Sequence, residues 1–150
     1  MVKKLNREAA VINLDPANEN MSYIPKINIM ELITAEEAMK TLNLGPNGAL
    51  MYCMEYLEEN FDWLLNQLLQ IKNCYLIFDL PGQVELYTHH NSIKNICEKL
   101  QKLNYHFCCV HMVDSHYCSD PSKFISTLLL SLSTMMQIGL PHVNVLTKVA

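Results

Sequence analysis

The amino-acid sequence predicts an α/β fold in which helices are layered against a mostly parallel sheet. Short apolar runs with the length of buried strands alternate with longer stretches of helical periodicity, and turns containing glycine or proline separate them. Such alternation is typical of parallel sheets joined by helical crossovers. The 150 residues are 50% hydrophobic and 17% charged, which suffices for the core of one domain, and no domain boundary is evident.

Four apolar runs predict the strands, and turn-forming or polar residues end them. The first run, AAVINL, stops at Asp15-Pro16, and the second, CYLIFDL, stops at Pro81-Gly82. The predicted strands are residues 9–14, 74–80, 106–113 and 142–147. The segment 18–27, in contrast, is polar and irregular, so we predict no regular structure there.

Two helices are predicted in the first half of the chain. Thr34 is a suitable N-cap, and Glu37 completes a capping box for a helix that ends at Leu42. The turn 45–48 precedes one long helix, whose apolar stripe at spacings of three and four forms either core or a dimer seam. The stripe consists of Leu50, Met54, Leu57, Phe61, Leu64 and Leu68.

Two more helices are predicted in the second half. Apolar residues recur on one face of residues 89–103. A further helix over residues 120–137 begins at Asp120, with Pro121 in the first helical position, and stops at Gly139.

Charge and cysteine content exclude several classes of protein. Eleven basic and fifteen acidic residues give a net charge of −4 without a basic stripe, so direct nucleic-acid binding is not expected. None of the six cysteines forms a Cys-x-x-Cys pair, and several lie in apolar runs, as buried thiols do in a reducing cytosol or nucleus. Residues 1–8 lack the apolar core of a signal peptide, and no apolar run reaches membrane-spanning length, so a soluble protein is expected.

The segment 79–85, Asp-Leu-Pro-Gly-Gln-Val-Glu, carries the sharpest chemical pattern. Asp79 ends an apolar strand, where it suits a magnesium ion or its water shell. Gly82 allows the backbone to approach a phosphate. Gln83 is placed to orient a water molecule and Glu85 to polarise it. The alternative is a strand followed by a solvated turn, and spacing alone does not separate the two.

Other candidates depend on weaker patterns. Asp15 and Asp114 also end strands, where an aspartate either lies at a ligand edge or serves as an N-cap or turn residue. By composition Gly45-Pro46-Asn47 is a turn. The histidine pairs 89/90 and 111/116 lack a third metal ligand at convincing spacing, so we interpret them as surface or hydrogen-bonded core residues.

Five motifs, in order along residues 9–148, resemble the GPN-loop GTPases. They are Asn13–Glu19 (NLDPANE), Leu44–Gly48 (LGPNG) with Met54–Tyr56, Asp79–Leu86 (DLPGQVEL), Phe124–Ser126 and Asn144–Lys148 (NVLTK). The resemblance implies a three-layer P-loop NTPase-like domain with a mostly parallel sheet, of which residues 1–150 form a part. It also implies a dimeric GTPase with GTP as substrate and Mg²⁺ as cofactor.

The same resemblance assigns roles to individual residues. Asp15, Gln83 and Glu85 handle the attacking water and the magnesium shell, and Asp79 lies near the metal, through water. Asn47, with Gly45 and Pro46, reaches the γ-phosphate region of the dimer partner, where a preorganised dipole stabilises developing charge. Gly82, Thr147 and Lys148 contact nucleotide. The implied partners are a second copy or a GPN-loop paralogue and RNA polymerase II or III subunits or assembly factors, in a cytoplasmic protein that shuttles to the nucleus; no membrane is implied.

Two motifs of the family are incomplete in this sequence. None of the four glycines precedes a lysine, so the phosphate-binding G-x-x-x-x-G-K-[ST] loop is absent, together with the strand expected before it. Ala150 stands where the guanine-reading motif has an aspartate. We therefore expect a partial chain: a fragment, a splice variant or an incomplete gene model. A non-catalytic product that binds a paralogue, and an unrelated α/β interaction domain, are the alternatives.

Overall fold

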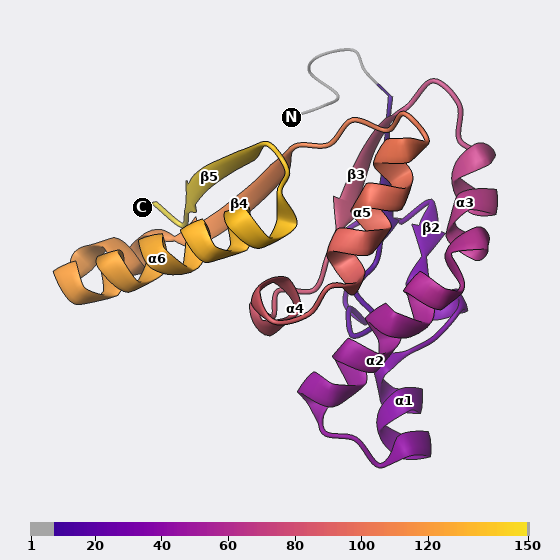
Figure 1. Ribbon diagram of the computed structural model, residues 1–150, viewed down its shortest axis with the longest axis horizontal. Helices are drawn as coiled ribbons and strands as arrows, with labels where there is room; N and C mark the ends of the chain where they lie inside the picture. The colour runs from indigo at the N-terminus through magenta and orange to yellow at the C-terminus, as the bar shows by residue number, and fades with distance from the viewer. Residues whose placement is uncertain (1–7, 150) are drawn as a thin grey trace. The chain divides into compact units, whose positions relative to one another are not determined.

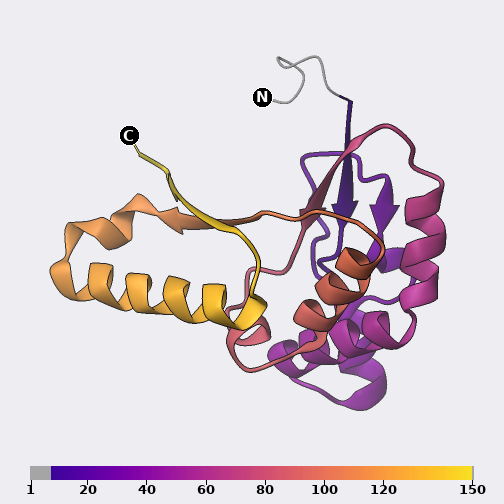
Figure 2. The ribbon, with the colours of Figure 1, turned by 45° about the horizontal axis from the view of Figure 1, so that its top comes forward.

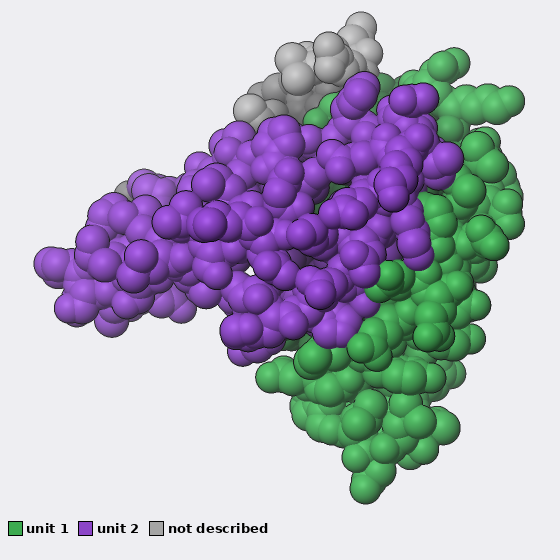
Figure 3. All heavy atoms as spheres, in the orientation of Figure 1, with its two compact units in different colours: residues 1–83 green, residues 84–150 purple. Residues whose placement is uncertain are grey.

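The computed structural model describes residues 8–149 and divides the chain into two compact units, residues 1–83 and 84–150 (Figure 1; Figure 3, green and purple). Both units combine parallel strands with helices. The predicted α/β class is therefore confirmed. Within residues 8–149, no helix is both long and apolar enough to cross a membrane.

Unit 1 is built on a three-stranded parallel sheet in which β1 lies in the centre. β1 (Ala9–Asn13) pairs with β2 (Ile27–Asn28) on one side and β3 (Tyr75–Asp79) on the other (Figure 2). All the pairs are parallel, so the carboxyl ends of the strands share one edge. The short β2 and the 3-10 turn η2 (Ile29–Glu31) were not predicted, because two residues of strand leave no periodic pattern.

Three helices, α1, α2 and α3, lie between β2 and β3 along the chain. α1 (Ala35–Leu42) begins with the predicted capping box: the Thr34 hydroxyl accepts from the Glu37 N–H, and the Glu37 carboxylate accepts from the Thr34 N–H. α2 (Pro46–Glu59) and α3 (Phe61–Leu69) replace the single long helix that the apolar stripe predicted. That prediction was wrong at Asn60, whose side chain donates to the Tyr56 carbonyl at 2.8 Å and whose backbone (φ −96°, ψ 35°) is not helical.

The apolar stripe nevertheless forms core, which is one of its two predicted roles, core or dimer seam. Five of its six members, all but the half-buried Phe61, are buried, so the break at Asn60 leaves them in the core. The fully buried side chains of unit 1 include Ile12, Ile29, Cys53, Met54, Leu57, Leu64 and Leu68. Burial of several large side chains is worth about 1.5–3 kcal/mol for each of them.

Unit 2 contains a second, two-stranded parallel sheet. β4 (Cys109–Asp114) pairs with β5 (His142–Thr147), and α6 (Pro121–Ile138) connects them (Figure 1). The Asp120 side chain caps α6, and Gly139 ends it with φ 69°, as predicted. β5 matches its predicted bounds, whereas β4 starts three residues later than predicted.

Short helices account for the other departures in unit 2. α4 (Glu85–Thr88) and the 3-10 helix η3 (Ser115–Ser119) were not predicted. α5 (Ser92–Lys102) is shorter than the predicted helix over residues 89–103. His89 is the C-cap of α4 and is not helical, and Asn91 is the N-cap of α5. The buried face of α5 consists of Ser92, Ile93, Ile96 and Leu100.

The expectation of buried thiols holds for only part of the chain. All six cysteines are free thiols, and Cys53 is fully buried. Cys108, in the predicted apolar run 106–113, is exposed, so the prediction was wrong there; Cys118, which lies outside the apolar runs, is exposed as well. Cys108 precedes β4 and Cys118 lies in η3, so both stand outside the strands.

Candidate functional site

The most compact group of candidate residues lies at the carboxyl ends of β1 and β3 in unit 1. The register places Asn13 opposite Asp79. Leu14 continues the pairing by donating its backbone N–H to the Asp79 carbonyl at 2.8 Å. Asp15 follows at once, so the two predicted carboxylates leave neighbouring strand ends at the edge where parallel sheets bind ligands.

Asn13 holds the turn that presents Asp15. The Asn13 side chain is fully buried. Its Nδ2 donates to the Asp15 carbonyl at 3.1 Å and to Asn28 Oδ1 at 2.9 Å, and its Oδ1 accepts from the Asp15 N–H at 3.2 Å. One buried amide therefore joins the ends of β1 and β2 and fixes the backbone of Asp15.

The segment between β1 and β2 holds the Asp79 carboxylate. The Tyr23 hydroxyl donates a hydrogen bond to Asp79 Oδ2. Asn18 Nδ2 lies 3.4 Å from the same oxygen and 3.4 Å from the Tyr23 hydroxyl oxygen. Removal from water, the hydrogen bond to Asp79 and the nearby negative charges raise the pKa of the Tyr23 phenol, so it stays protonated and remains a donor.

The environment of Asp15 differs from that of Asp79. Burial raises the pKa of the Asp15 carboxyl above its ordinary value. The Ala17 N–H, which donates to Asp15 Oδ1 at 2.9 Å, lowers that pKa, and the charge of Asp79 raises it. The two carboxylates thus repel each other. A divalent cation relieves such repulsion, and Mg²⁺ is commonly held by one or two carboxylates with phosphate and water oxygens, so these residues fit the implied ion.

The turn after β3 contains three of the predicted residues. Pro81 is buried, whereas Gly82 is exposed. A β-carbon at Gly82 would meet no atom within 4 Å, and Gly82 does not adopt positive φ, so the structure itself does not require glycine there. Gln83 Oε1 is buried and has no hydrogen-bond partner among residues 8–149. Such an acceptor suits a water molecule, which can donate to it. Glu85, the first residue of α4, belongs to unit 2.

The Gly45-Pro46-Asn47 turn forms the start of α2. Gly45 is the N-cap and makes no side-chain capping bond, and Pro46 is the first helical residue. All three residues are exposed. Their helix therefore presents backbone N–H groups and the positive end of its dipole to the surroundings, an arrangement that favours an anionic group.

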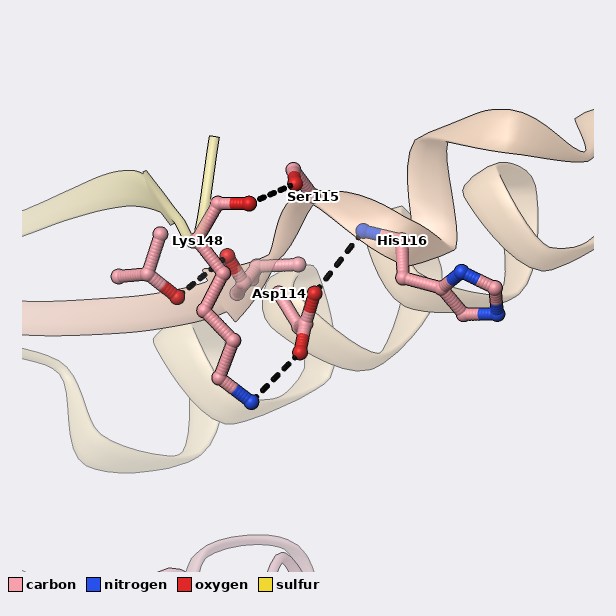
Figure 4. Close-up of polar contacts among 6 residues, drawn as sticks. Asp114, Ser115, His116 and Lys148 are labelled. Atoms are coloured by element: carbon pink, nitrogen blue, oxygen red, sulfur yellow. Dashed lines mark hydrogen bonds and ion pairs between the residues drawn. The ribbon is translucent and has the colours of Figure 1, made fainter. Parts of the chain in front are cut away.

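In unit 2, polar side chains gather where β4 and β5 end (Figure 4). Lys148 Nζ lies 2.8 Å from Asp114 Oδ2, and the Lys148 carbonyl accepts from Ser115 Oγ at 2.9 Å. The hydrogen bond from Lys148, followed by that from the His116 N–H, lowers the pKa of Asp114. Thr147 Oγ1 donates to the Val113 carbonyl at 3.2 Å. Asp114 is thus an ion-pair partner and the N-cap of η3, one of its predicted roles.

The histidines lie as the sequence predicted, at the surface or hydrogen-bonded to neighbouring side chains. His89 and His116 are exposed. His111 Nδ1 lies 3.2 Å from Ser131 Oγ, which donates to Asn144 Oδ1 at 2.6 Å. No group of three or more His, Cys, Asp or Glu side chains suited to a metal ion occurs in the part of the chain that the structure describes.

Comparison with known proteins places these features in one family. A protein-family model described as "Conserved hypothetical ATP binding protein" matches residues 1–150. Proteins named GPN-loop GTPase 2 match at 57% identity over 147 residues (Danio rerio) and 51% over 147 residues (the Dictyostelium discoideum homolog). This chain belongs to the GPN-loop GTPase family. Its stretches 88–90 and 113–118 resemble GPN-loop GTPase 2 among the paralogues, and the named relatives agree.

A solved structure extends the comparison to the fold. The apo form of a GTPase from Pyrococcus abyssi superposes with a TM-score of 0.81 at 28% sequence identity. The match covers 97% of this chain and 58% of the Pyrococcus abyssi chain. The match confirms a P-loop NTPase-like fold. The chain spans about half the length of the curated relatives that it matches: 47% of the zebrafish protein and 49% of GPN-loop GTPase QQT1 of Arabidopsis thaliana, which is 52% identical.

The main residues that sequence reasoning missed are Asn13, whose side chain joins the ends of β1 and β2, and Tyr23 and Asn18, which bond to Asp79. Asn13 and Asn18 lie inside the first family motif, but no rule of spacing linked either one to β3. Tyr23 lies in the irregular segment 18–27. Only a tyrosine in a polar stretch that follows the strand-end Asp15 marked the place.

Proposed function

We propose that this chain forms the metal- and water-handling part of a site that binds and hydrolyses GTP with Mg²⁺. The observation that carries the proposal is the convergence of Asp15 and Asp79 at neighbouring ends of β1 and β3, where their charges interact. A bound Mg²⁺ would supply positive charge to the phosphates. Asp79, through water, and Asp15 would hold its shell.

The remaining residues act on water and on developing charge. The buried, unpartnered Gln83 Oε1 accepts a hydrogen bond from the attacking water and orients it. By family resemblance, Glu85 would polarise that water. Family resemblance supports a base contact for Thr147 and Lys148 and backbone access at Gly82. Lys148 has φ 54°, which turns the chain at the end of β5.

The exposed helix start at Gly45, Pro46 and Asn47 supports a dimeric site. Backbone donors at the start of α2 and the Asn47 amide are available to the phosphate region of a partner molecule. The partner is a second copy or a GPN-loop paralogue. By family resemblance, the cycle serves assembly and nuclear import of RNA polymerase II and III, in a protein that moves between cytoplasm and nucleus.

Nucleotide binding tests the catalytic proposal. Purified residues 1–150 are titrated with a fluorescent GTP analogue and Mg²⁺, with unlabelled GTP and ATP as competitors. Saturable binding that GTP displaces and that Asp79→Asn weakens is the expected result. Absence of saturable binding refutes GTP hydrolysis by this chain and favours the second candidate.

The second candidate is a non-catalytic product that binds a full-length paralogue or a polymerase-assembly partner. The outward face of α6 favours it: the only charged residue of this 18-residue helix is Lys123. Ile125, Leu129, Leu132 and Met136 are 54%, 63%, 47% and 73% exposed at spacings of four, three and four. Such a stripe matches a partner helix.

Co-purification with a full-length GPN-loop GTPase tests this candidate. Leu129→Asp is expected to abolish association, whereas Gln101→Asp, at an exposed position of α5 outside the stripe, serves as the control for added charge. Failure of the wild-type chain to associate in both the GTP- and the GDP-bound state contradicts the candidate.

A further inference from the structure

The segment between β1 and β2 contributes more to the site than a connection. It returns the chain from Asp15 to Ile27, and Lys26 rejoins the sheet by donating its N–H to the Val11 carbonyl at 2.7 Å. Between these points, Tyr23 and Asn18 both direct donors to one carboxylate oxygen of Asp79, 56 and 61 residues away in sequence. An irregular segment thereby acquires two polar contacts to a strand end.

We propose that Tyr23, supported by Asn18, is a positioning residue that fixes the Asp79 carboxylate for its metal and ties the segment 17–26 to the end of β3. A carboxylate rotates easily about its last side-chain bond, because that torsion is broad. Two donors on Oδ2 restrict this rotation, and neither of them contacts Oδ1. The restricted carboxylate therefore offers one defined oxygen to the metal shell.

Chemistry and burial support this role. A hydrogen bond from a phenol to a carboxylate, such as that from Tyr23 to Asp79, is charge-assisted and therefore stronger than one between neutral groups. Tyr23 is half-buried, so its ring and hydroxyl are held against the end of β3 rather than free in solvent. Asn18 closes the triangle by lying within 3.4 Å of both partners. Hydrogen-bonded partners of metal-ligating carboxylates orient them, and their loss typically weakens metal binding about 10–100-fold.

Amide hydrogen exchange tests the tie without any metal. Tyr23→Phe removes the donor and keeps the ring, and Tyr75→Phe, at a 56% exposed tyrosine of β3, is the matched control. The hydrogen-bonded amides of Glu19 and Lys26 flank Tyr23. We expect them to exchange at least about tenfold faster in Tyr23→Phe than in the wild type, since a bond to a charged group is lost. Equal rates in the two variants overturn the proposal.

Metal titration tests the second part, which rests on the proposed function. Mn²⁺ binding is followed by electron paramagnetic resonance in the wild type, both tyrosine variants and Asp79→Asn. The expected result is about tenfold weaker binding for Tyr23→Phe and no change for Tyr75→Phe. Unchanged binding in Tyr23→Phe, where Asp79→Asn weakens it, overturns the positioning role.

The two experiments separate the failure of this inference from the failure of the proposed function. If the wild type does not bind Mn²⁺, the metal part of the proposed function is refuted for this chain. The exchange rates of Glu19 and Lys26 then decide on Tyr23 alone. If Tyr23→Phe does not fold, Asp79→Asn weakens the same hydrogen bond from its acceptor side, and unchanged exchange in that variant overturns the proposal.

Discussion

Asn13→Ala removes the buried amide that joins the ends of β1 and β2. Three hydrogen bonds at 2.9–3.2 Å are lost inside a fully buried site. Each is worth about 1 kcal/mol net, and more where a buried partner is left unsatisfied. Asn28 Oδ1 retains the Met30 N–H at 3.2 Å, which offsets part of the loss. We therefore expect a decrease of about 2–4 kcal/mol in the free energy of unfolding of unit 1.

Urea denaturation followed by tryptophan fluorescence measures this change. Trp63 is the only tryptophan and lies in α3 of unit 1, so the signal reports on that unit. The expected shift of the midpoint is about 1–2 M urea toward lower concentration.

The matched control is Asn66→Ala at an exposed position of α3. Alanine is favoured in a helix, so this variant should be neutral or slightly stabilised. If the unfolding free energies of Asn13→Ala and Asn66→Ala lie within about 0.5 kcal/mol of each other, the assignment of Asn13 as the hub of the strand ends is refuted.

Three further predictions concern other parts of the chain. Nuclear magnetic resonance should find the pKa of the Asp114 carboxyl below its ordinary value of 3.8, and Lys148→Met should raise it. Because the pKa is lowered in the folded state, the ionised Asp114 carboxylate stabilises the fold fully above pH 3.8. That stabilisation is lost as the pH falls through the lowered pKa. Mass spectrometry after brief alkylation of the native protein should find Cys118 modified and Cys53 intact, since Cys118 is exposed whereas burial raises the pKa of Cys53 to about 11; early modification of Cys53 contradicts its position in the core. Gly139→Ala should lower the thermal stability of unit 2 by about 1 kcal/mol, because φ is 69° there although no atom obstructs a β-carbon; an unchanged melting temperature refutes this conformation.

Local patterns predicted most elements of the fold. The sequence is sufficient to place the helix caps Thr34 and Asp120, the helix end at Gly139 and strand β5. Each of these features depends on interactions with residues only a few positions away in the chain. The division of one apolar stripe into α2 and α3 was missed, because the helical spacing of the apolar residues continues across the break. The break lies at Asn60, whose side chain donates to the Tyr56 carbonyl.

The candidate site divides in the same way. Its chemistry is written in the sequence: aspartates end two apolar strands, a Pro-Gly-Gln turn follows one of them, and a glycine and a proline begin a helix. Those residues also carry the resemblance to the GPN-loop GTPases, and the family is confirmed by comparison.

The tertiary structure alone decided which of these groups meet. The β1–β3 register brings Asp15 and Asp79 together across more than sixty residues of chain, and the segment between β1 and β2 delivers Tyr23 to Asp79. Local spacing carries no information about such contacts, because hydrogen-bonded pairing between distant strands depends on the packing of the whole unit. The sequence by itself therefore determined the residue types, the elements and the family, and folding determined that a tyrosine from an irregular segment holds the strand-end aspartate.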